Sequence, residues 1–507
     1  MKKVIIIGAG IGGLATANLL AASGYEVVIY EQNDQPGGRA GRLHIDGFTF
    51  DTGPSWYLMP EVFEQYFRLF GEDVSTLLEL QRLDPAYKVF FEGEAAPVTI
   101  HADLEADKQT FEQIESGSGA RLERYLARSE DIYTAAIEQF LYTNFERPQT
   151  MLRPATIKTL PRMAVAALTP IDRYVGRYFQ DSRLRRIMEY PMVFLGTSPY
   201  EAPAIYSLMS HMDFNQGVFY PRRGLYAIIE ALVAIGTRSG VTYHYNTAVS
   251  KIESIQGIAT GVRLENGTVD EADIIISNAD LHFTETQLLA PANRTYDAGY
   301  WKKKQAGPSA LLMYLGVKGS LPELDHHNLL FTEDWRANFD AIFKTKTWPT
   351  PASIYICKPS QTDATVAPAG HENMFVLVPA PANPDVTPQQ LEALSETYLD
   401  QIVAMTGIAD LKDRIVVKRL AGPNDFAHTY NAWQGTALGL SHRLNQSALF
   451  RPSNHSKRLN NLYYVGANTT PGVGLPMCLI GAELVYKRLT GDTTSTPITS
   501  LLRSSDA

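Results

Sequence analysis

Three glycines near the N-terminus, Gly8, Gly10 and Gly13, follow a short apolar run and open a longer one. Residues 4–7 are Val-Ile-Ile-Ile, the β-branched composition of a buried strand. Residues 14–23 have the composition of a helix. The order of strand, glycine loop and helix predicts the first half of a βαβ unit with a parallel sheet.

The spacing G-x-G-x-x-G and an acid after the next strand are typical of a dinucleotide site. Gly8 allows the tight turn, Gly10 lets a pyrophosphate approach the backbone, and Gly13 lets the helix pack on the strand. Free N–H groups and the helix dipole attract the pyrophosphate to the helix N-terminus. Glu31, after a strand over residues 25–30, is placed to bind ribose hydroxyls, which disfavours NADP. The alternative is a structural glycine turn in an unrelated α/β fold.

Residues 4–25 carry no charge and follow two lysines, a pattern that a signal peptide or a membrane span also shows. The glycines interrupt the run and the second strand ends it, so a βαβ unit is the better interpretation.

The composition excludes several classes of protein. The 507 residues include 54 acids and 45 bases, for a net charge of −9, and this balance disfavours a nucleic-acid partner. Two cysteines, Cys357 and Cys478, are too few for a disulfide scaffold or a multi-thiolate centre. No other cluster has the spacing of metal ligands, so we expect no metal.

A second glycine loop with a cation, Gln-Pro-Gly-Gly-Arg-Ala over residues 35–40, follows the ribose acid. An NAD domain has no use for this loop, whereas FAD extends a flat isoalloxazine ring beyond its pyrophosphate. We therefore expect Gly38 and Arg39 beside FAD. Residues 47–55 alternate as a strand into a Gly-Pro turn that suits a backbone beside the ring.

The C-terminal region predicts a matching strand, loop and helix. Residues 462–465 form an apolar run, Gly466 and Gly474 bound the loop, and a helix is predicted over residues 475–489 with Pro476 in its first turn. A helix N-terminus aimed at the flavin would stabilise the reduced anionic ring. Taken alone, this pattern equally fits a capping loop without a ligand.

The N-terminal block through Arg39 and residues 464–476 resemble the bacterial-type phytoene desaturases of the FAD-dependent amine-oxidase-like superfamily. Residues 83–87 and 217–225 also resemble that family, so the similarity extends over nearly the whole chain. Arg223 departs from it, since the family often has Gly-Gly after Pro-Arg. The resemblance implies an α/β fold: a Rossmann-like FAD-binding domain of the GR2 flavoprotein type with an inserted α+β substrate domain.

The same resemblance implies a discontinuous division of the chain. The FAD-binding domain would comprise residues 1–80, 216–290 and 456–507, and the substrate domain would comprise residues 81–215 and 291–455. The expected cofactor-binding residues are Gly8, Ala9, Gly10, Gly12, Gly13, Glu31, Gly38, Arg39, Asp51, Gly53, Pro54, Ser55, Val249, Asn278, Ala279, Gly466, Gly474, Pro476 and Met477. For the turn at residues 278–279, a strand with a polar turn is an equal alternative.

The segment from Arg147 to Arg186 combines nine basic and two acidic residues with apolar ones. Such a segment suits an anionic membrane surface. A solvated helical face over an ordinary core is the alternative. The resemblance favours the membrane, because the family's hydrocarbon substrates dissolve in bilayers. We therefore expect a cytoplasmic protein that is peripheral on the membrane.

The resemblance implies FAD-dependent desaturation of a phytoene-like polyene, of C30 or C40 length, by hydride transfer to flavin in carotenoid biosynthesis. A quinone or oxygen is the expected electron acceptor, because no second dinucleotide motif is present. His211 and Asp213 are candidate proton acceptors, although a buried, hydrogen-bonded pair is the favoured alternative. Rival functions are a carotenoid isomerase or ketolase, an amine oxidase, and a prenyl carrier that lacks flavin.

Overall fold

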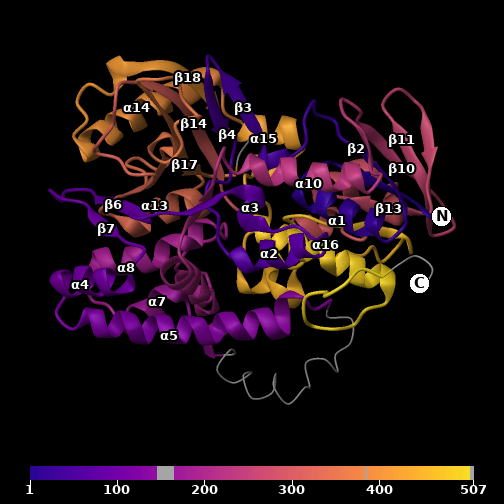
Figure 1. Ribbon diagram of the computed structural model, residues 1–507, viewed down its shortest axis with the longest axis horizontal. Coiled ribbons are helices and arrows are strands. Elements are labelled where there is room, and N and C mark those ends of the chain that lie inside the picture. Colours follow the sequence, from indigo (N-terminus) through magenta and orange to yellow (C-terminus); the bar gives the residue numbers. More distant parts are fainter. Residues whose placement is uncertain (145–164, 383–384, 503–507) are drawn as a thin grey trace.

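The computed structural model describes residues 1–144, 165–382 and 385–502. A parallel five-stranded sheet has the order β19–β13–β1–β2–β9, and its strands β2 and β13 are labelled in the right-hand half of Figure 1. The strands are β1 (Lys3–Ile7), β2 (Glu26–Tyr30), β9 (Thr242–His244), β13 (Ile274–Ser277) and β19 (Leu462–Tyr464). Strand β1 pairs with both β2 and β13, and both of its faces are covered, which explains its unbroken apolar run.

Three helices lie beside this sheet: α1 (Ile11–Ala22), α10 (Tyr226–Arg238) and α16 (Leu475–Thr490). Helix α1 packs against both of the others. Eleven of the twelve residues of α1 are buried, because the helix is apolar on all sides. The expected βαβ unit is present. Within the described part of the chain, no helix has the length and apolar character that crossing a membrane requires.

A seven-stranded mixed sheet has the order β18–β14–β17–β16–β15–β6–β7. Its strands are β6 (Tyr87–Phe91), β7 (Val98–Ile100), β14 (Ser309–Lys318), β15 (His327–Phe331), β16 (Ile354–Cys357), β17 (His371–Ala380) and β18 (Ile415–Ala421). Alternate residues of β14 enter different cores: Leu311 packs in the core beneath α14 (Pro388–Thr406), whereas Leu312 faces the central core. This alternation follows from the two-residue period of a strand.

A helical layer lies across the lower left of Figure 1. It contains α4 (Leu104–Ile114), α5 (Ser118–Ala136), which continues as a π-helical turn to Leu141, α7 (Ile171–Val175) and α8 (Ser182–Glu189). Further α-helices are α2 (Pro60–Arg68), α3 (Val74–Leu78), α9 (Leu208–Ser210), α11 (Leu281–Phe283), α12 (Ala298–Trp301), α13 (Trp335–Asp340) and α15 (Pro423–Tyr430). The remaining strands are β3 (Arg42–Ile45), β4 (Phe48–Asp51), β5 (Leu80–Arg82), β8 (Phe219–Pro221), β10 (Val249–Ile255), β11 (Ile258–Leu264) and β12 (Val269–Glu271).

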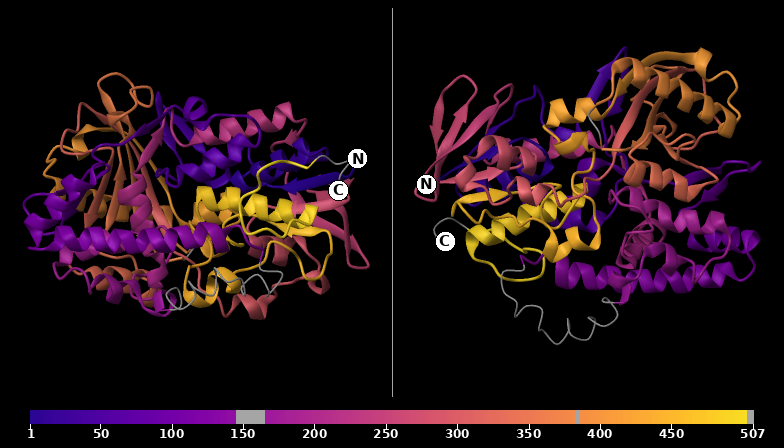
Figure 2. Two further views of the ribbon diagram at one scale, coloured as in Figure 1. Left: turned by 60° about the horizontal axis from the view of Figure 1, so that its bottom comes forward. Right: turned by 180° about the vertical axis from the view of Figure 1, so that it is seen from behind.

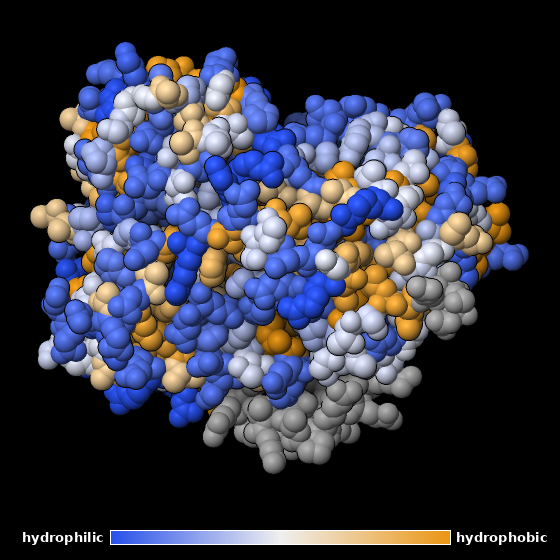
Figure 3. Space-filling model, in the orientation of Figure 1, coloured by the Kyte–Doolittle hydropathy of each residue, from blue (hydrophilic) through white to orange (hydrophobic). Residues whose placement is uncertain are grey.

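The two large sheets draw on different stretches of the chain. All strands of the parallel sheet come from residues 1–80, 216–290 and 456–507, and all strands of the mixed sheet come from the other two stretches. The antiparallel unit β10–β11–β12 and the mixed sheet lie at opposite ends of the molecule (Figure 2). The face in Figure 3 is mostly polar, with smaller apolar areas. The domain boundaries themselves stay a prediction.

The basic segment is only partly described, because its residues up to 164 lie outside the described residues. In the described part, Arg183 pairs with Asp181 at 2.9 Å and Arg185 pairs with Asp172 at 3.4 Å. The two acids of the segment therefore neutralise two of its cations locally.

Candidate active site

A cavity of about 780 Å³ runs from the carboxyl ends of the parallel strands to the mixed sheet and the helical layer. The glycine loops and Glu31 line one end of the cavity, and aromatic and aliphatic side chains line the rest. Carboxyl ends of parallel strands are where ligands bind in open α/β sheets. The cavity therefore has a polar end, formed by the two glycine loops and Glu31 and called the glycine cradle below, and an apolar compartment.

The glycine loop approaches the side chain of Asn278, which follows β13. A Cβ at Gly10 would lie 2.6 Å from Asn278 Nδ2, and a Cβ at Gly13 would clash with the carbonyl oxygen of Gly8. Gly13 therefore has no room for a side chain, whereas a side chain at Gly10 would displace the amide of Asn278. Gly10 is the N-cap of α1 and has no side-chain cap, so the first N–H groups of this helix face the cavity end without a protein side chain.

Glu31 is buried at the end of β2 and lines the cavity. Its Oε2 accepts a hydrogen bond of 2.7 Å from Ala9 N, and its Oε1 accepts bonds from Asn33 N at 2.9 Å and Asn33 Nδ2 at 2.8 Å. The carboxylate is thus fixed between the glycine loop and the residues that follow β2, where the ribose of a dinucleotide is expected.

Arg39 supplies a cation inside the cavity. Its Nη2 donates a single long hydrogen bond of 3.4 Å to Thr436 O, and its Nε is buried with no partner among the described residues. The guanidinium also lies 5.7 Å from the ring centroid of Tyr430. Arg39 is half-buried, and no carboxylate among the described residues pairs with it. A pyrophosphate would satisfy it.

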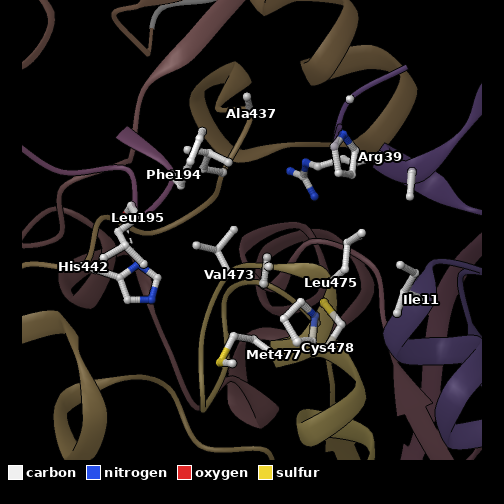
Figure 4. Close-up of a pocket in the computed structure, with 18 of the residues that line it drawn as sticks. Ile11, Arg39, Phe194, Leu195, Ala437, His442, Val473, Leu475, Met477 and Cys478 are labelled. Atoms are coloured by element: carbon white, nitrogen blue, oxygen red, sulfur yellow. Dashed lines mark hydrogen bonds between the residues drawn. The ribbon is translucent and has the colours of Figure 1, made fainter. Parts of the chain in front are cut away.

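The loop before α16 closes the cradle from the opposite side. Gly474 has φ of +123°, a conformation that favours glycine, and caps the N-terminus of α16. Val473, Leu475 and Met477 project into the cavity opposite Phe194 (Figure 4). The glycine cradle, the unpaired Arg39 and this helix N-terminus together fit the pyrophosphate and isoalloxazine ring of FAD.

Sixteen of the nineteen expected cofactor residues line the cavity: Gly8, Gly10, Gly12, Glu31, Gly38, Arg39, Gly53, Pro54, Ser55, Val249, Asn278, Ala279, Gly466, Gly474, Pro476 and Met477. Ala9, Gly13 and Asp51 do not. Ala9 donates its N–H to Glu31, and Gly13 packs against the carbonyl oxygen of Gly8. Asp51 turns away and accepts hydrogen bonds from Leu225 N at 2.8 Å and Tyr226 N at 3.0 Å, so it anchors the start of α10.

The structure places neither candidate proton acceptor among the cavity-lining residues, although both are buried. Asp213 Oδ2 accepts hydrogen bonds of 2.8 Å from the hydroxyls of Tyr87 and Tyr190, and burial raises the pKa of this carboxyl to about 7. His211 Nδ1 lies 2.9 Å from Asn215 Nδ2, and burial lowers its pKa. The π-helical turn His211–Gln216 directs both side chains away from the cavity. Its neighbour Met212 faces the cavity instead.

His442 does line the cavity, and no motif in the sequence indicated it. Its Nδ1 lies 2.9 Å from the carbonyl oxygen of Leu195 (Figure 4). A carbonyl only accepts, so Nδ1 carries the proton and Nε2 carries the lone pair. Nε2 lies against the cofactor-side loop, because a Cβ at Gly472 would clash with it. Burial, and then the charge of Arg451, hold the pKa of His442 well below its usual range, so the imidazole is neutral.

An aromatic wall borders the apolar compartment. Trp56 stacks on His327 with ring centroids 4.3 Å apart, and the ring centroid of Phe194 lies 5.5 Å from that of Trp56. Tyr355 joins Ser55 to His327 through hydrogen bonds of 2.7 Å on each side. The high aromatic content was visible in the sequence, but which aromatic residues meet depends on the pairing of the mixed sheet.

Comparison with known proteins agrees with this geometry. The model of the family described as flavin containing amine oxidoreductase matches residues 11–485. A carotenoid 3,4-desaturase of Haloarcula japonica is 42% identical to this chain, over 97% of this chain and 98% of the relative's chain. A zeta-carotene-forming phytoene desaturase of Myxococcus xanthus is 39% identical, covering 96% and 94%.

Solved structures show the same fold. Putrescine oxidase bound to putrescine has a TM-score of 0.62 at 14% identity, with 97% of this chain and 98% of that chain covered. Cyclohexylamine oxidase from Brevibacterium oxydans has a TM-score of 0.61 at 14% identity, with 97% and 99% covered. A family model that spans most of the chain, together with the glycine cradle, leads to one conclusion. The protein belongs to the flavin-containing amine oxidoreductase family.

Proposed function

We propose that this protein is an FAD-dependent desaturase of a long polyene hydrocarbon, acting in carotenoid biosynthesis. The observation that carries the proposal is the division of the cavity. Its charged lining residues among those described, Glu31, Arg39 and Asp280, all belong to the cofactor end. A hydrocarbon has no polar handle, so it requires a compartment whose walls are apolar. The names of the two desaturase relatives, which match over nearly their full lengths, support the same reaction class.

Desaturation removes a hydride and a proton from two adjacent carbons and leaves a double bond between them. FAD, when bound, supplies the acceptor for the hydride. The residues expected to hold FAD are the glycine cradle, Glu31, Arg39 and the α16 N-terminus. The apolar walls formed by Phe194, Leu195 and Met477 exclude water and orient the chain of the substrate (Figure 4).

We infer that His442 takes the proton at Nε2. Loss of hydride from an allylic carbon makes the C–H bonds of the next carbon strongly acidic, so a weak base is sufficient. The base must be unprotonated before it can accept the proton. The lowered pKa of His442 keeps its imidazole unprotonated. The hydrogen bond from Nδ1 to Leu195 holds the lone pair of Nε2 in a fixed direction.

The polyene is proposed to enter from a membrane. Leu444, Leu449 and Phe450 line the cavity and are also 41%, 50% and 62% exposed. Leu168, 75% exposed, follows Ala167, which also lines the cavity. Apolar side chains that are at once cavity walls and solvent-exposed mark a mouth suited to lipid. A quinone or oxygen would serve as the electron acceptor of the bound FAD.

The test is direct. Purified protein loaded with FAD is mixed with phytoene in liposomes and a quinone, and the pigments are extracted. The expected result is a new polyene absorption at longer wavelength, and its position counts the double bonds introduced. Unchanged phytoene, with FAD bound and liposomes present, would exclude phytoene as the substrate, and equally unchanged C30 and partly desaturated C40 polyenes in the same assay would overturn the proposal. Turnover of an amine instead would assign the chain to the rival oxidase function.

A further inference from the structure

Three metal-binding side chains meet behind the aromatic wall: His326, His327 and Cys357. Strand pairing causes this meeting, because His327 at the start of β15 lies opposite Cys357 of β16. One ring nitrogen of each histidine and the Sγ of Cys357 lie within 4.8 Å of one another. The exposed fractions are 2%, 0% and 2%, so solvent does not reach the cluster.

Each of the two imidazoles is anchored by a hydrogen bond at Nδ1, and its Nε2 has no hydrogen-bond partner among the described residues. His326 Nδ1 lies 2.7 Å from Thr362 Oγ1, and His327 Nδ1 lies 2.7 Å from the hydroxyl of Tyr355. The Nε2 atoms of both histidines are buried without a partner among the described residues. Metal-binding histidines typically use one ring nitrogen for the metal and anchor the other by a hydrogen bond.

The chemistry of the three side chains suits a divalent cation of intermediate softness. Imidazole binds a metal through an unprotonated ring nitrogen, and a bound cation displaces the proton of a thiol. The charge of the thiolate then offsets half of the charge of a divalent metal.

We propose that His326, His327 and Cys357 form a Zn²⁺ site. Zn²⁺ takes imidazole and thiolate ligands in tetrahedral geometry. Three protein ligands leave a fourth position, which a water molecule would take. The Tyr220 hydroxyl is buried without a partner among the described residues, and its ring lies 4.6 Å from that of His326.

The position of the site suggests a structural role. Trp56 stacks on His327, and both Trp56 and Tyr355 line the cavity. Zn²⁺ would therefore tie β15 to β16 directly behind that wall and hold the tryptophan in place. This inference does not depend on the substrate, and the sequence alone predicted no metal, since the three residues carry no recognisable ligand spacing.

The test measures metal content in the flavin-loaded protein, expressed with zinc and dialysed against metal-free buffer. Mass spectrometry of the elements should find one zinc per chain in the wild type and in Cys478→Ala, the matched control at the other cysteine. His326→Ala and Cys357→Ala should each contain less than a tenth of that amount. A zinc-free wild type that also takes up no added Zn²⁺ would overturn the proposal.

A second measurement separates loss of metal binding from loss of folding in the variants. Protein grown with Co²⁺ in place of zinc should show the thiolate-to-cobalt charge-transfer absorption, and Cys357→Ala should lack it while its circular dichroism matches the wild type. Zinc that persists in both cluster variants, or a different metal that disappears with them, would refute a Zn²⁺ site at these residues.

Discussion

His442 donates its Nδ1–H to the carbonyl oxygen of Leu195 across 2.9 Å, although 247 residues separate them. The bond sets the tautomer and directs the Nε2 lone pair of a neutral imidazole within a cavity that is otherwise mostly apolar. A base built in this way remains available at any physiological pH.

The first prediction tests this base. His442→Ala should lower desaturation by about 10²- to 10⁴-fold, the usual contribution of a positioned base. FAD content should stay unchanged. Added imidazole should restore part of the rate, because the substitution leaves a space of matching shape. The control is His371→Ala, on β17 outside the cavity-lining set. Full activity in His442→Ala, or no rescue by imidazole at any concentration, would exclude the role.

The second prediction concerns the ribose acid. Glu31→Gln keeps the shape of the side chain but loses its charge, so hydrogen bonds to ribose and to Ala9 N weaken. A charge-assisted hydrogen bond contributes roughly 1.5–3 kcal/mol, which predicts an increase of about 10- to 100-fold in the Kd for FAD. Flavin fluorescence titration of the apoprotein measures it. Glu26→Gln, at the exposed start of the same strand, should bind FAD as the wild type does.

The third prediction concerns stability against pH. The pKa of Asp213 is raised to about 7, so the folded protein keeps a proton that the unfolded chain releases above about pH 4. The contribution of Asp213 to the free energy of unfolding is therefore greatest below about pH 4. It declines as the pH rises to about 7, by about 1.4 kcal/mol per pH unit at most.

Asp213→Asn retains an acceptor for Tyr87 and Tyr190 and cannot ionise. Urea unfolding at pH 5 and pH 7 should show that the wild type loses more stability over this interval than the variant does. Equal losses in the two proteins would mean that Asp213 is ionised in the folded state.

The fourth prediction concerns the cavity mouth. The double substitution of Leu449 and Phe450 by Asp should abolish flotation with anionic liposomes, because both exposed apolar groups become charged. Val416→Asp changes an apolar side chain that is 53% exposed on β18, away from the cavity-lining set, and should leave flotation intact. Binding that survives the double substitution would place the membrane contact elsewhere.

The cofactor end was predictable from the sequence because its signals are local. Gly10, Gly13 and Glu31 belong to one stretch whose strand, turn and helix follow from residue spacing, and the structure has that βαβ unit. The C-terminal loop at Gly474 was predictable for the same reason: a β-branched or aromatic run, a glycine and a helix follow one another directly.

The substrate end depends on contacts between distant residues, so spacing alone could not indicate it. Asp51 and His211 occupy segments near the cavity, yet a strand and a π-helical turn direct their side chains elsewhere. His442 acquires its orientation from Leu195, and the histidine–cysteine cluster exists only because β15 pairs with β16 in one register. A side chain's direction and partners are set by packing, whereas a glycine turn and a helix start are set by the chain itself.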